Sequence, residues 1–177
     1  MITLIIILIA VPVILLIALF RKNGFKLERK ILINRPLADV FSYVNLLKNQ
    51  DNFNKWVMMD PNRKKTFIGT DGTVGFIYSW ESKQKRAGKA NMQITRTTTN
   101  ERINFEIHFE RPVPSIAYMS MQLQAITGTQ TNLIWSFYGN PRPYYLLRVA
   151  HLLFRVKKVV GWDMQESLEM LKQILEK

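Results

Sequence analysis

Between residues 25 and 140, apolar and polar residues alternate in short runs with a period of two. This pattern is typical of β-strands that bury one face. Turn residues such as Asp71-Gly72 and Asn100-Glu101 separate the runs. The expected strands are 25–33, 64–68, 73–81, 86–98, 102–110, 115–126 and 131–137. Because strands joined by short links pair as neighbours, we expect an antiparallel meander with one apolar and one polar face.

The alternation also predicts which side chains face the core. The expected core-facing residues of the later strands are Val74, Phe76, Tyr78 and Trp80; Ala90, Met92 and Ile94; Ile103, Phe105, Ile107 and Phe109; Ala117, Met119, Met121, Leu123 and Ala125; and Leu133, Trp135 and Phe137. A sheet with one apolar face needs a second layer of structure to cover that face.

Helical patterns lie between the first expected strand and the other six, and again after the last strand. Pro36 is expected to open a short helix with Val40, Phe41 and Val44 on its apolar stripe, and a second short helix or irregular segment covers 46–56. The last third of the chain, 143–176, predicts one long helix, or one broken near Gly161.

The end of that long helix is amphipathic. We expect Asn140 to cap its start, with Pro141 and Pro143 in the first turn. Apolar residues recur at helical spacing at Met164, Leu168, Leu171 and Leu175. The charged residues Asp163, Glu166, Glu169, Lys172 and Glu176 are expected mostly on the other faces. The long helix is therefore the expected cover for the sheet.

The first residues predict a membrane anchor. Residues 2–20 carry no charge, and 19 residues in a helix span roughly 30 Å, the thickness of bilayer hydrocarbon. A cleaved signal peptide would have a basic segment before the apolar run, and a buried core helix would be shorter and one-sided. Arg21 and Lys22 follow the run, so the positive-inside rule places the rest of the chain in the cytoplasm. The expected domains are a transmembrane anchor, 1–22, and one folded domain, 23–177.

This order of elements resembles the START-like or SRPBCC superfamily, the helix-grip proteins of the polyketide cyclase/dehydrase and lipid-transfer group, including bacterial members with a membrane anchor. The residues that carry the resemblance are Ile33-Asn34-Arg35-Pro36, Val40-Phe41, Trp56, 69–75, Tyr78-Ser79-Trp80, 131–135 and the helix ending at 168–175. The resemblance implies an α+β helix-grip fold, in which a curved antiparallel sheet wraps a long C-terminal helix, over about 25–176. It also implies a cavity for apolar ligands between sheet and helix, and no catalytic residue common to the superfamily.

The composition excludes several kinds of chemistry. The chain has no Cys and only two His, so neither a thiolate site nor a His/Cys zinc site is expected. The formal net charge is +12, and the basic residues cluster at 21–30, 63–65, 83–89 and 148–158. They are not interleaved with an aromatic platform, which argues against nucleic acid and leaves an anionic lipid surface or a merely solvated basic face. The segment 146–160 is a candidate interfacial helix.

Three smaller patterns have ordinary structural explanations. Gly69, Gly72 and Gly75 lack the Gly-Lys-Ser/Thr of a phosphate loop and predict a hairpin with a bulge. Glu106, His108 and Glu110 share the polar face of one strand, where acid–base catalysis is not expected. His151 lies among apolar residues of the long helix and is expected to be packed or interfacial.

The aromatic and Met residues are the candidate ligand site. The expected ligand-binding residues are Trp56, Tyr78, Trp80, Phe105, Met119, Met121, Trp135, Phe137 and Met164. Most of them are expected to fill the core, while Tyr78, Trp80, Met119, Met121 and Trp135 are the hypothesised lining of an apolar pocket.

We therefore expect a tethered domain that binds or transfers a hydrophobic small molecule, such as a lipid, a quinone or a polyketide-like compound, at the membrane surface. No catalytic residue, metal or cofactor is expected. The alternatives are a cyclase- or hydrolase-type enzyme that uses the same cavity, and a non-catalytic stress or interaction scaffold.

Overall fold

The computed structural model describes residue 12 and residues 25–84, 87–140 and 156–177. The elements are β1 (Phe25–Ile33), α2 (Leu37–Val44), the 3-10 turn η1 (Leu47–Asn49), α3 (Gln50–Phe53), α4 (Lys55–Met58), β2 (Lys64–Ile68), β3 (Ile77–Glu81), β4 (Lys89–Thr98), β5 (Arg102–Arg111), β6 (Ser115–Thr127), β7 (Gln130–Asn140) and α6 (Val156–Leu175). The expected anchor 1–22, apart from residue 12, the helical segment 143–155 and His151 lie outside the described residues.

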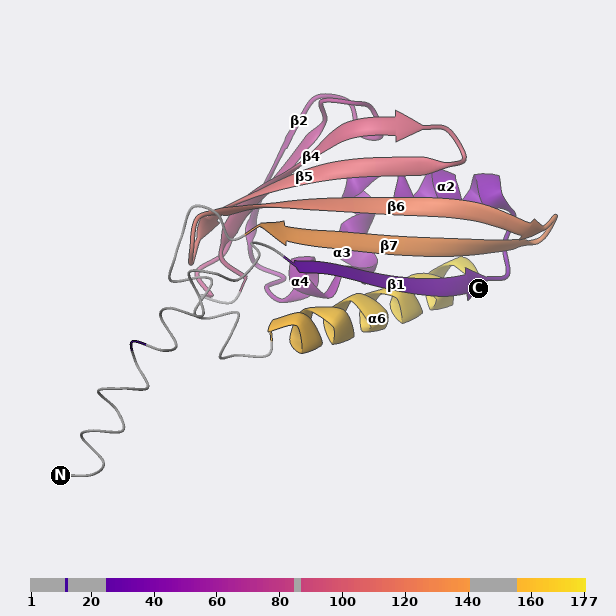
Figure 1. Cartoon of the computed structure of the whole chain (residues 1–177). Helices are drawn as coiled ribbons and strands as arrows, with labels where there is room; N and C mark the ends of the chain where they lie inside the picture. Colours follow the sequence, from indigo (N-terminus) through magenta and orange to yellow (C-terminus); the bar gives the residue numbers. More distant parts are fainter. Residues whose placement is uncertain (1–11, 13–24, 85–86, 141–155) are drawn as a thin grey trace, which may run out of the picture.

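Seven strands form one antiparallel sheet in the order β1-β7-β6-β5-β4-β3-β2 (Figure 1). Strands β2 to β7 follow each other as neighbours, and only β1 joins from a distance, pairing with β7 from Phe25↔Gly139 to Ile33↔Thr131. The meander predicted from the alternation is confirmed, and the fold is α+β with a curved antiparallel sheet beside a C-terminal helix.

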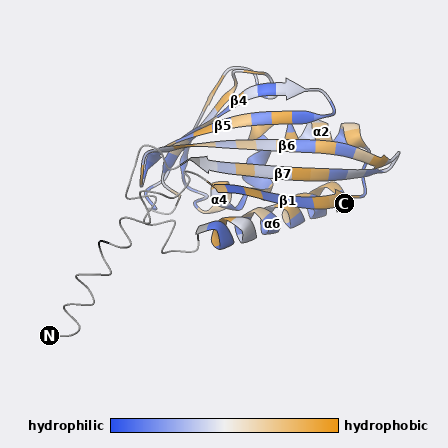
Figure 2. Ribbon diagram, viewed as in Figure 1, coloured by the Kyte–Doolittle hydropathy of each residue, from blue (hydrophilic) through white to orange (hydrophobic). Residues whose placement is uncertain are grey.

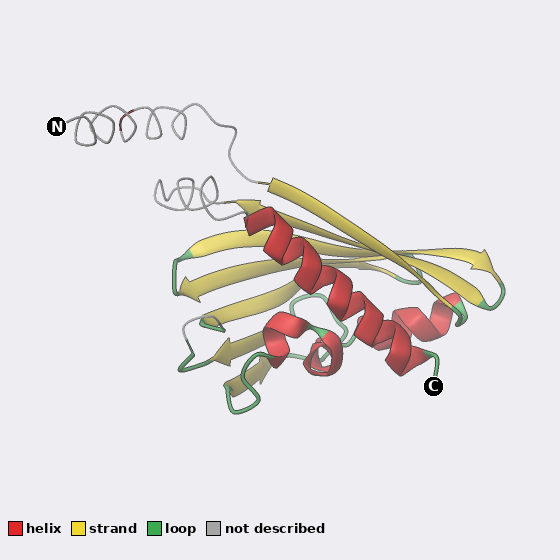
Figure 3. Cartoon of the chain, turned by 90° about the horizontal axis from the view of Figure 1, so that it is seen from below, coloured by secondary structure: helices red, strands yellow, loops and turns green. Residues whose placement is uncertain are grey.

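The helices form a second layer on one face of the sheet. Figure 3 shows α6 running diagonally across this face, with the short helices beside it, and Figure 2 shows apolar and polar residues alternating along the strands. The buried residues on the helix side come from every strand from β3 to β7 as well as from α2, α3, α4 and α6. One core therefore fills the space between the two layers, as the one-faced pattern predicts.

Strand register aligns the core side chains into rows across the sheet. One row runs Ile94–Phe105–Met119–Phe137, and the next contains Ile103–Met121–Trp135. Each of these residues is at most 7% exposed. Burying a side chain of this size stabilises the fold by roughly 1.5–3 kcal/mol, so these rows hold the middle of the sheet to the helical layer.

Helix α6 is unbroken from Val156 to Leu175, so the break considered near Gly161 is not present. The guanidinium of Arg29, from β1, packs closely against this glycine. The Arg29 Nε donates a hydrogen bond to the Gly161 carbonyl at 3.1 Å, and a Cβ at this position would lie 2.3 Å from Arg29 Nη2.

The buried face of α6 is more polar than its sequence suggests. Met164, Leu168 and Leu171 are fully buried as predicted, but Asp163 is also buried, at 5% exposure. Its expected place on a polar face is therefore wrong. The physical reason is hydrogen bonding: Asp163 Oδ2 accepts from the Trp56 indole Nε1 at 3.1 Å, and Lys55 Nζ lies 3.3 Å from Oδ1. A buried carboxylate is tolerated when it is paired in this way.

The end of α6 is held by the turn between β1 and α2. Arg35 Nε donates to the Leu175 carbonyl, Lys172 Nζ donates to the Leu32 carbonyl at 2.8 Å, and the Asn34 amide donates to Glu176 Oε1 at 2.6 Å. The carbonyls of a last helical turn have no partner within the helix. Arg35 supplies such a partner to Leu175, and the three contacts together join the end of α6 to the end of β1 and the turn after it.

Two expected details are wrong. Val74 is 61% exposed in the turn before β3, because the positive φ angles of Gly72 and Gly75 reverse the chain there. Ala125 is exposed, close to the bulge between Ala125 and Thr127. Asn140 ends β7, paired with Ile116, and the helix start expected after it lies outside the described residues. Among the described residues, no helix is both long and apolar enough to cross a bilayer.

Candidate functional site

The expected ligand-binding residues all lie on the helix side of the sheet or on helices that face it, in two aromatic groups. Trp56 contacts the rings of Trp135 and Phe137, with centroids 6.2 and 5.8 Å apart. Tyr78 and Trp80 form a second group with centroids 5.9 Å apart. Phe105, Met119 and Met121 lie on the central strands between the two groups, and Met164 enters from α6; all four are 0–3% exposed.

The first group is centred on Trp135 of β7. Phe53 of α3 packs edge-on against Trp135 at 6.4 Å and 74°, and Trp56 of α4 does so at 6.2 Å and 77°. Edge-to-face geometry is the favoured arrangement of aromatic pairs. The two short helices therefore deliver one ring each onto the same indole, which is fully buried.

Two buried side-chain nitrogens, one on this indole and one on α3, are not hydrogen bonded. Among the residues that the structure describes, neither Trp135 Nε1 nor Gln50 Nε2 has a partner, and both side chains are fully buried. Gln50 is one helical turn before Phe53, the residue whose ring packs on Trp135. A buried donor without a partner costs about 1–3 kcal/mol. Two such donors near one apolar cluster mark a place where an acceptor is missing.

The indole of Trp56, in contrast to that of Trp135, is hydrogen bonded. Its Nε1 donates to Asp163, and Lys55 pairs with Asp163 and Glu166. The hydrogen bond to Glu166 is the main cause that raises the pKa of Lys55, and the contacts with Asp163 raise it further. Ser167 Oγ donates to the Asp163 carbonyl at 2.6 Å and accepts from the Lys55 amide at 3.0 Å. Helix α4 is thus fastened to α6 by polar contacts beside the aromatic cluster.

The second group contains a buried charge cluster that the sequence did not reveal. The Tyr78 hydroxyl accepts from Arg63 Nη2 at 2.9 Å and donates to Asp51 Oδ1. The same Asp51 oxygen pairs with Arg63, and the other carboxylate oxygen, Oδ2, pairs with Lys65. Burial, and then the hydrogen bond to Asp51, raise the pKa of Tyr78 well above its ordinary value.

Arg63 itself is 7% exposed, so its expected place in a basic surface patch is wrong. No sequence signal pairs Asp51 with Arg63, because their contact depends on how the α3 segment folds onto β3. The polar end of Tyr78 is occupied by these charges. Trp80 is similarly held, with Nε1 donating to the Ala87 carbonyl at 3.0 Å.

The remaining candidate residues lie in a turn and on the outer face of the sheet. Gly69, Gly72 and Gly75 have φ angles of 83–92° and form the turn before β3, where Asp71 accepts from the amides of η1. Glu106 and His108 pair at 2.5 Å on the half-exposed outer face, and Glu110 pairs with Lys89 at 2.7 Å. No group of His, Cys, Asp and Glu able to hold a metal occurs among the described residues.

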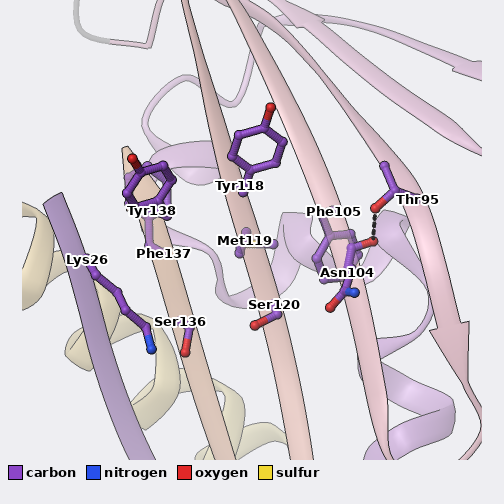
Figure 4. A pocket seen from close by; sticks show the side chains of 10 residues that line it. All are labelled: Lys26, Thr95, Asn104, Phe105, Tyr118, Met119, Ser120, Ser136, Phe137 and Tyr138. Carbon is purple, nitrogen blue, oxygen red and sulfur yellow. Dashed lines mark hydrogen bonds between the residues drawn. The ribbon is translucent and has the colours of Figure 1, made fainter. Parts of the chain in front are cut away.

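A hollow of about 320 Å³ opens on the opposite, outer face of the sheet (Figure 4). It is lined by Lys26, Thr95, Asn104, Phe105, Tyr118, Met119, Ser120, Ser136, Phe137 and Tyr138. Phe105, Met119 and Phe137 belong to the expected ligand site, but strand alternation directs their side chains into the core, so they border this hollow from below. The sequence reasoning did not single out its outward-facing residues.

Comparison with solved structures settles the fold. A protein CV1439 from Chromobacterium violaceum superposes with a TM-score of 0.58 at 16% identity, over 88% of this chain and 98% of that one. MLL2253 from Mesorhizobium loti gives 0.61 at 14% identity, over 85% and 96%. Ara h 8.0201 gives 0.59 at 12% identity, over 86% and 97%.

The chain has the helix-grip fold. The resemblance to SRPBCC proteins is therefore supported at the level of fold, and identities of 12–16% carry nothing further. No family model and no curated protein sequence matches the chain.

Proposed function

We propose that this helix-grip domain binds a hydrophobic small molecule between the sheet and α6, next to Trp135. The observation that carries the proposal is the pair of buried, unpartnered donors, Trp135 Nε1 and Gln50 Nε2, found among the described residues beside an apolar cluster. Ligand sites in proteins are mostly apolar and contain a few placed polar groups that orient the ligand.

The chemistry of this region defines the ligand class. The aromatic and Met side chains around Trp135 offer apolar contact, and both free groups are donors. The ligand is therefore a mostly apolar molecule with one or two acceptor oxygens, as in a quinone, a lipid ester or a polyketide-like ketone. A molecule without an acceptor would leave both donors unpaired, so its binding would not recover the free energy lost by burying them.

The membrane is the proposed source of this ligand. The uncharged segment 2–20 ends five residues before β1 begins at Phe25, so a membrane helix in this segment would hold the domain at the bilayer surface. With the positive-inside rule, the domain faces the cytoplasm. A tethered domain would extract, present or sense a ligand of its own membrane instead of carrying it between compartments.

Native mass spectrometry of the full chain, released from its own membranes in mild detergent, tests this function. We expect a bound molecule of constant mass in the wild type, and three- to tenfold lower occupancy in Trp135→Phe, which keeps the ring but removes the donor. Trp162→Phe is the matched control, because Trp162 is 62% exposed on α6. A wild type without any bound molecule, or equal occupancy in Trp135→Phe, would contradict the proposal.

A further inference from the structure

The outer hollow arises from the register of β6 and β7. Tyr118 lies opposite Tyr138, and Ser120 lies opposite Ser136 two residues further along. Successive outward residues of a strand are about 6.6 Å apart, so a pair of large rings stands directly beside a pair of small hydroxyls. Figure 4 shows the two rings standing next to the two serines. The change in side-chain size makes the depression.

The rings form a continuous aromatic wall. Tyr118 and Tyr138 stack with centroids 6.3 Å apart and planes at 25°, yet they remain 45% and 38% exposed. Exposed aromatic side chains that stack on each other on a sheet surface leave a ring face available to a ligand. Their hydroxyls make no hydrogen bond to the described part of the chain, and Lys26 lies opposite Tyr138 at the edge of the wall.

The floor of the hollow beside this wall is polar, and most of its side chains make few hydrogen bonds within the described residues. Asn104 lies opposite Ser120 on the next strand, and neither side chain is hydrogen bonded to any described residue. Ser136 Oγ donates to Glu28 Oε2 at 3.1 Å, and Thr95 Oγ1 donates to the Asn104 carbonyl at 3.2 Å. Serine hydroxyls and asparagine amides both donate and accept. The floor therefore suits a ligand whose groups also do both.

The charge and polarity of the lining argue against two other ligand classes. Lys26 is the only cation among the described residues that line it, and its Nζ lies 3.6 Å from Glu28, which leaves little net charge for a phosphate or carboxylate. A lipid tail would place its methylenes on Ser120, Ser136 and Asn104 and leave their polar atoms unpaired. A volume of about 320 Å³ is at the small end of ligand pockets.

We propose that this hollow is a second binding site, for the polyhydroxylated ring of a sugar or an inositol. The C–H face of such a ring packs on Tyr118 and Tyr138, and its hydroxyls exchange hydrogen bonds with Ser120, Asn104 and Ser136. The site is on the face of the sheet away from α6, so it is independent of the interior ligand. The ring can belong to a free saccharide or to the headgroup of a membrane lipid.

The test uses the full chain in phosphatidylcholine nanodiscs, prepared without sugar-based detergent. Saturation-transfer NMR and calorimetry are run with methyl glucoside, methyl galactoside, methyl mannoside and myo-inositol. The same protein is then placed in nanodiscs with and without a monoglucosyl diacylglycerol, and the headgroup protons are observed. Binding of a free ring identifies a soluble ligand, and binding of the glycolipid headgroup alone identifies a membrane source. Absence of both overturns the proposal.

Two substitutions locate the binding. Tyr118→Ala removes half of the aromatic wall, and Ser120→Leu fills the floor while keeping both rings; each is expected to weaken binding about five- to tenfold. Trp162→Ala, an exposed aromatic on the helical layer, and Trp135→Phe, in the interior site, should leave saccharide binding unchanged. If both single variants, Tyr118→Ala and Ser120→Leu, fold and bind the ring with unchanged affinity, the assignment to this hollow is overturned. Loss of saccharide binding in Trp135→Phe would place the ring in the interior site and would also overturn the assignment.

Discussion

At the scale of single residues, charged and hydrogen-bonding groups lie at positions where the sequence predicts either an apolar core or an exposed surface. Tyr78 was expected to offer an apolar ring to a pocket, and Arg63 to belong to a basic patch. In the structure the Tyr78 hydroxyl joins Arg63 to Asp51 beneath the sheet. Alternation along β3 predicted the direction of Tyr78, but no local pattern predicts a partner contributed by another element.

Because of Tyr78, the stability of the fold is expected to fall as the pH rises into the alkaline range. Its pKa is raised by burial and by Asp51, so the folded state holds the proton more tightly than the unfolded state. The resulting stabilisation is complete below about pH 10, the ordinary tyrosine pKa, and is lost as the pH rises above it.

Urea unfolding at pH 8 and at several values above 10 should therefore show a steeper loss of stability in the wild type than in Tyr78→Phe. Tyr43→Phe is the control, because Tyr43 is only partly buried and is not in this cluster. Parallel pH dependence in the wild type and Tyr78→Phe would contradict the role given to the Asp51 and Arg63 contacts.

At the scale of elements, the strands and the buried stripe of α6 were predictable, because a period of two or of 3.6 states which face is buried. Segment ends were less predictable. The last strand was expected to end at Phe137, yet pairing with Ile116 carries β7 to residue 140. Gly161 resembles a helix break, yet α6 continues through it, with the Arg29 side chain of β1 packed against it.

Gly161 and Arg29 should therefore be energetically coupled. In the wild type, Gly161→Ala gains up to about 1 kcal/mol of helix propensity but displaces the Arg29 guanidinium and its hydrogen bond to the Gly161 carbonyl. In an Arg29→Ala background that contact is already absent. Gly161→Ala should then be more favourable by about 1 kcal/mol, measured by a double-mutant cycle in urea. Additive effects would show that the two residues do not interact.

Helix α6 should contribute to stability through its buried stripe. Leu168→Ala removes a fully buried side chain and should lower the free energy of unfolding by about 2–5 kcal/mol. Trp162→Ala, six residues earlier and 62% exposed, should change it by no more than about 0.5 kcal/mol. Thermal and urea unfolding of the two variants provide the comparison. Similar losses in both would mean that the exposed face of α6 is also covered.

At the scale of the whole molecule, the helix-grip architecture could be predicted because the order of elements and the position of the cover helix are both visible in the sequence. The site was predicted less completely. Alternation correctly directed Trp135, Met119 and Phe105 toward the helical layer. It did not distinguish an indole with a partner, Trp56, from one without, Trp135, because that difference depends on Asp163 of α6.

The proposed tether concerns the chain as a whole. Full-length protein should remain in the membrane pellet after washing with high salt and with alkaline carbonate, because 19 uncharged residues bind bilayer hydrocarbon and not its surface charge. A variant lacking residues 1–22 should move to the soluble fraction, or be released by salt if its basic surface suffices for binding. Extraction of the full-length chain by carbonate would contradict the tether.

The interior ligand is tested most directly by the indole N–H signals of the four tryptophans, recorded with ¹⁵N labelling of the full chain in nanodiscs. On addition of a membrane-soluble quinone or of lipids extracted from the native membrane, the Trp135 signal should move downfield as its N–H gains an acceptor. Those of Trp80, bonded to Ala87, and of exposed Trp162 should stay in place. An unmoved Trp135 signal across these additions would contradict the account.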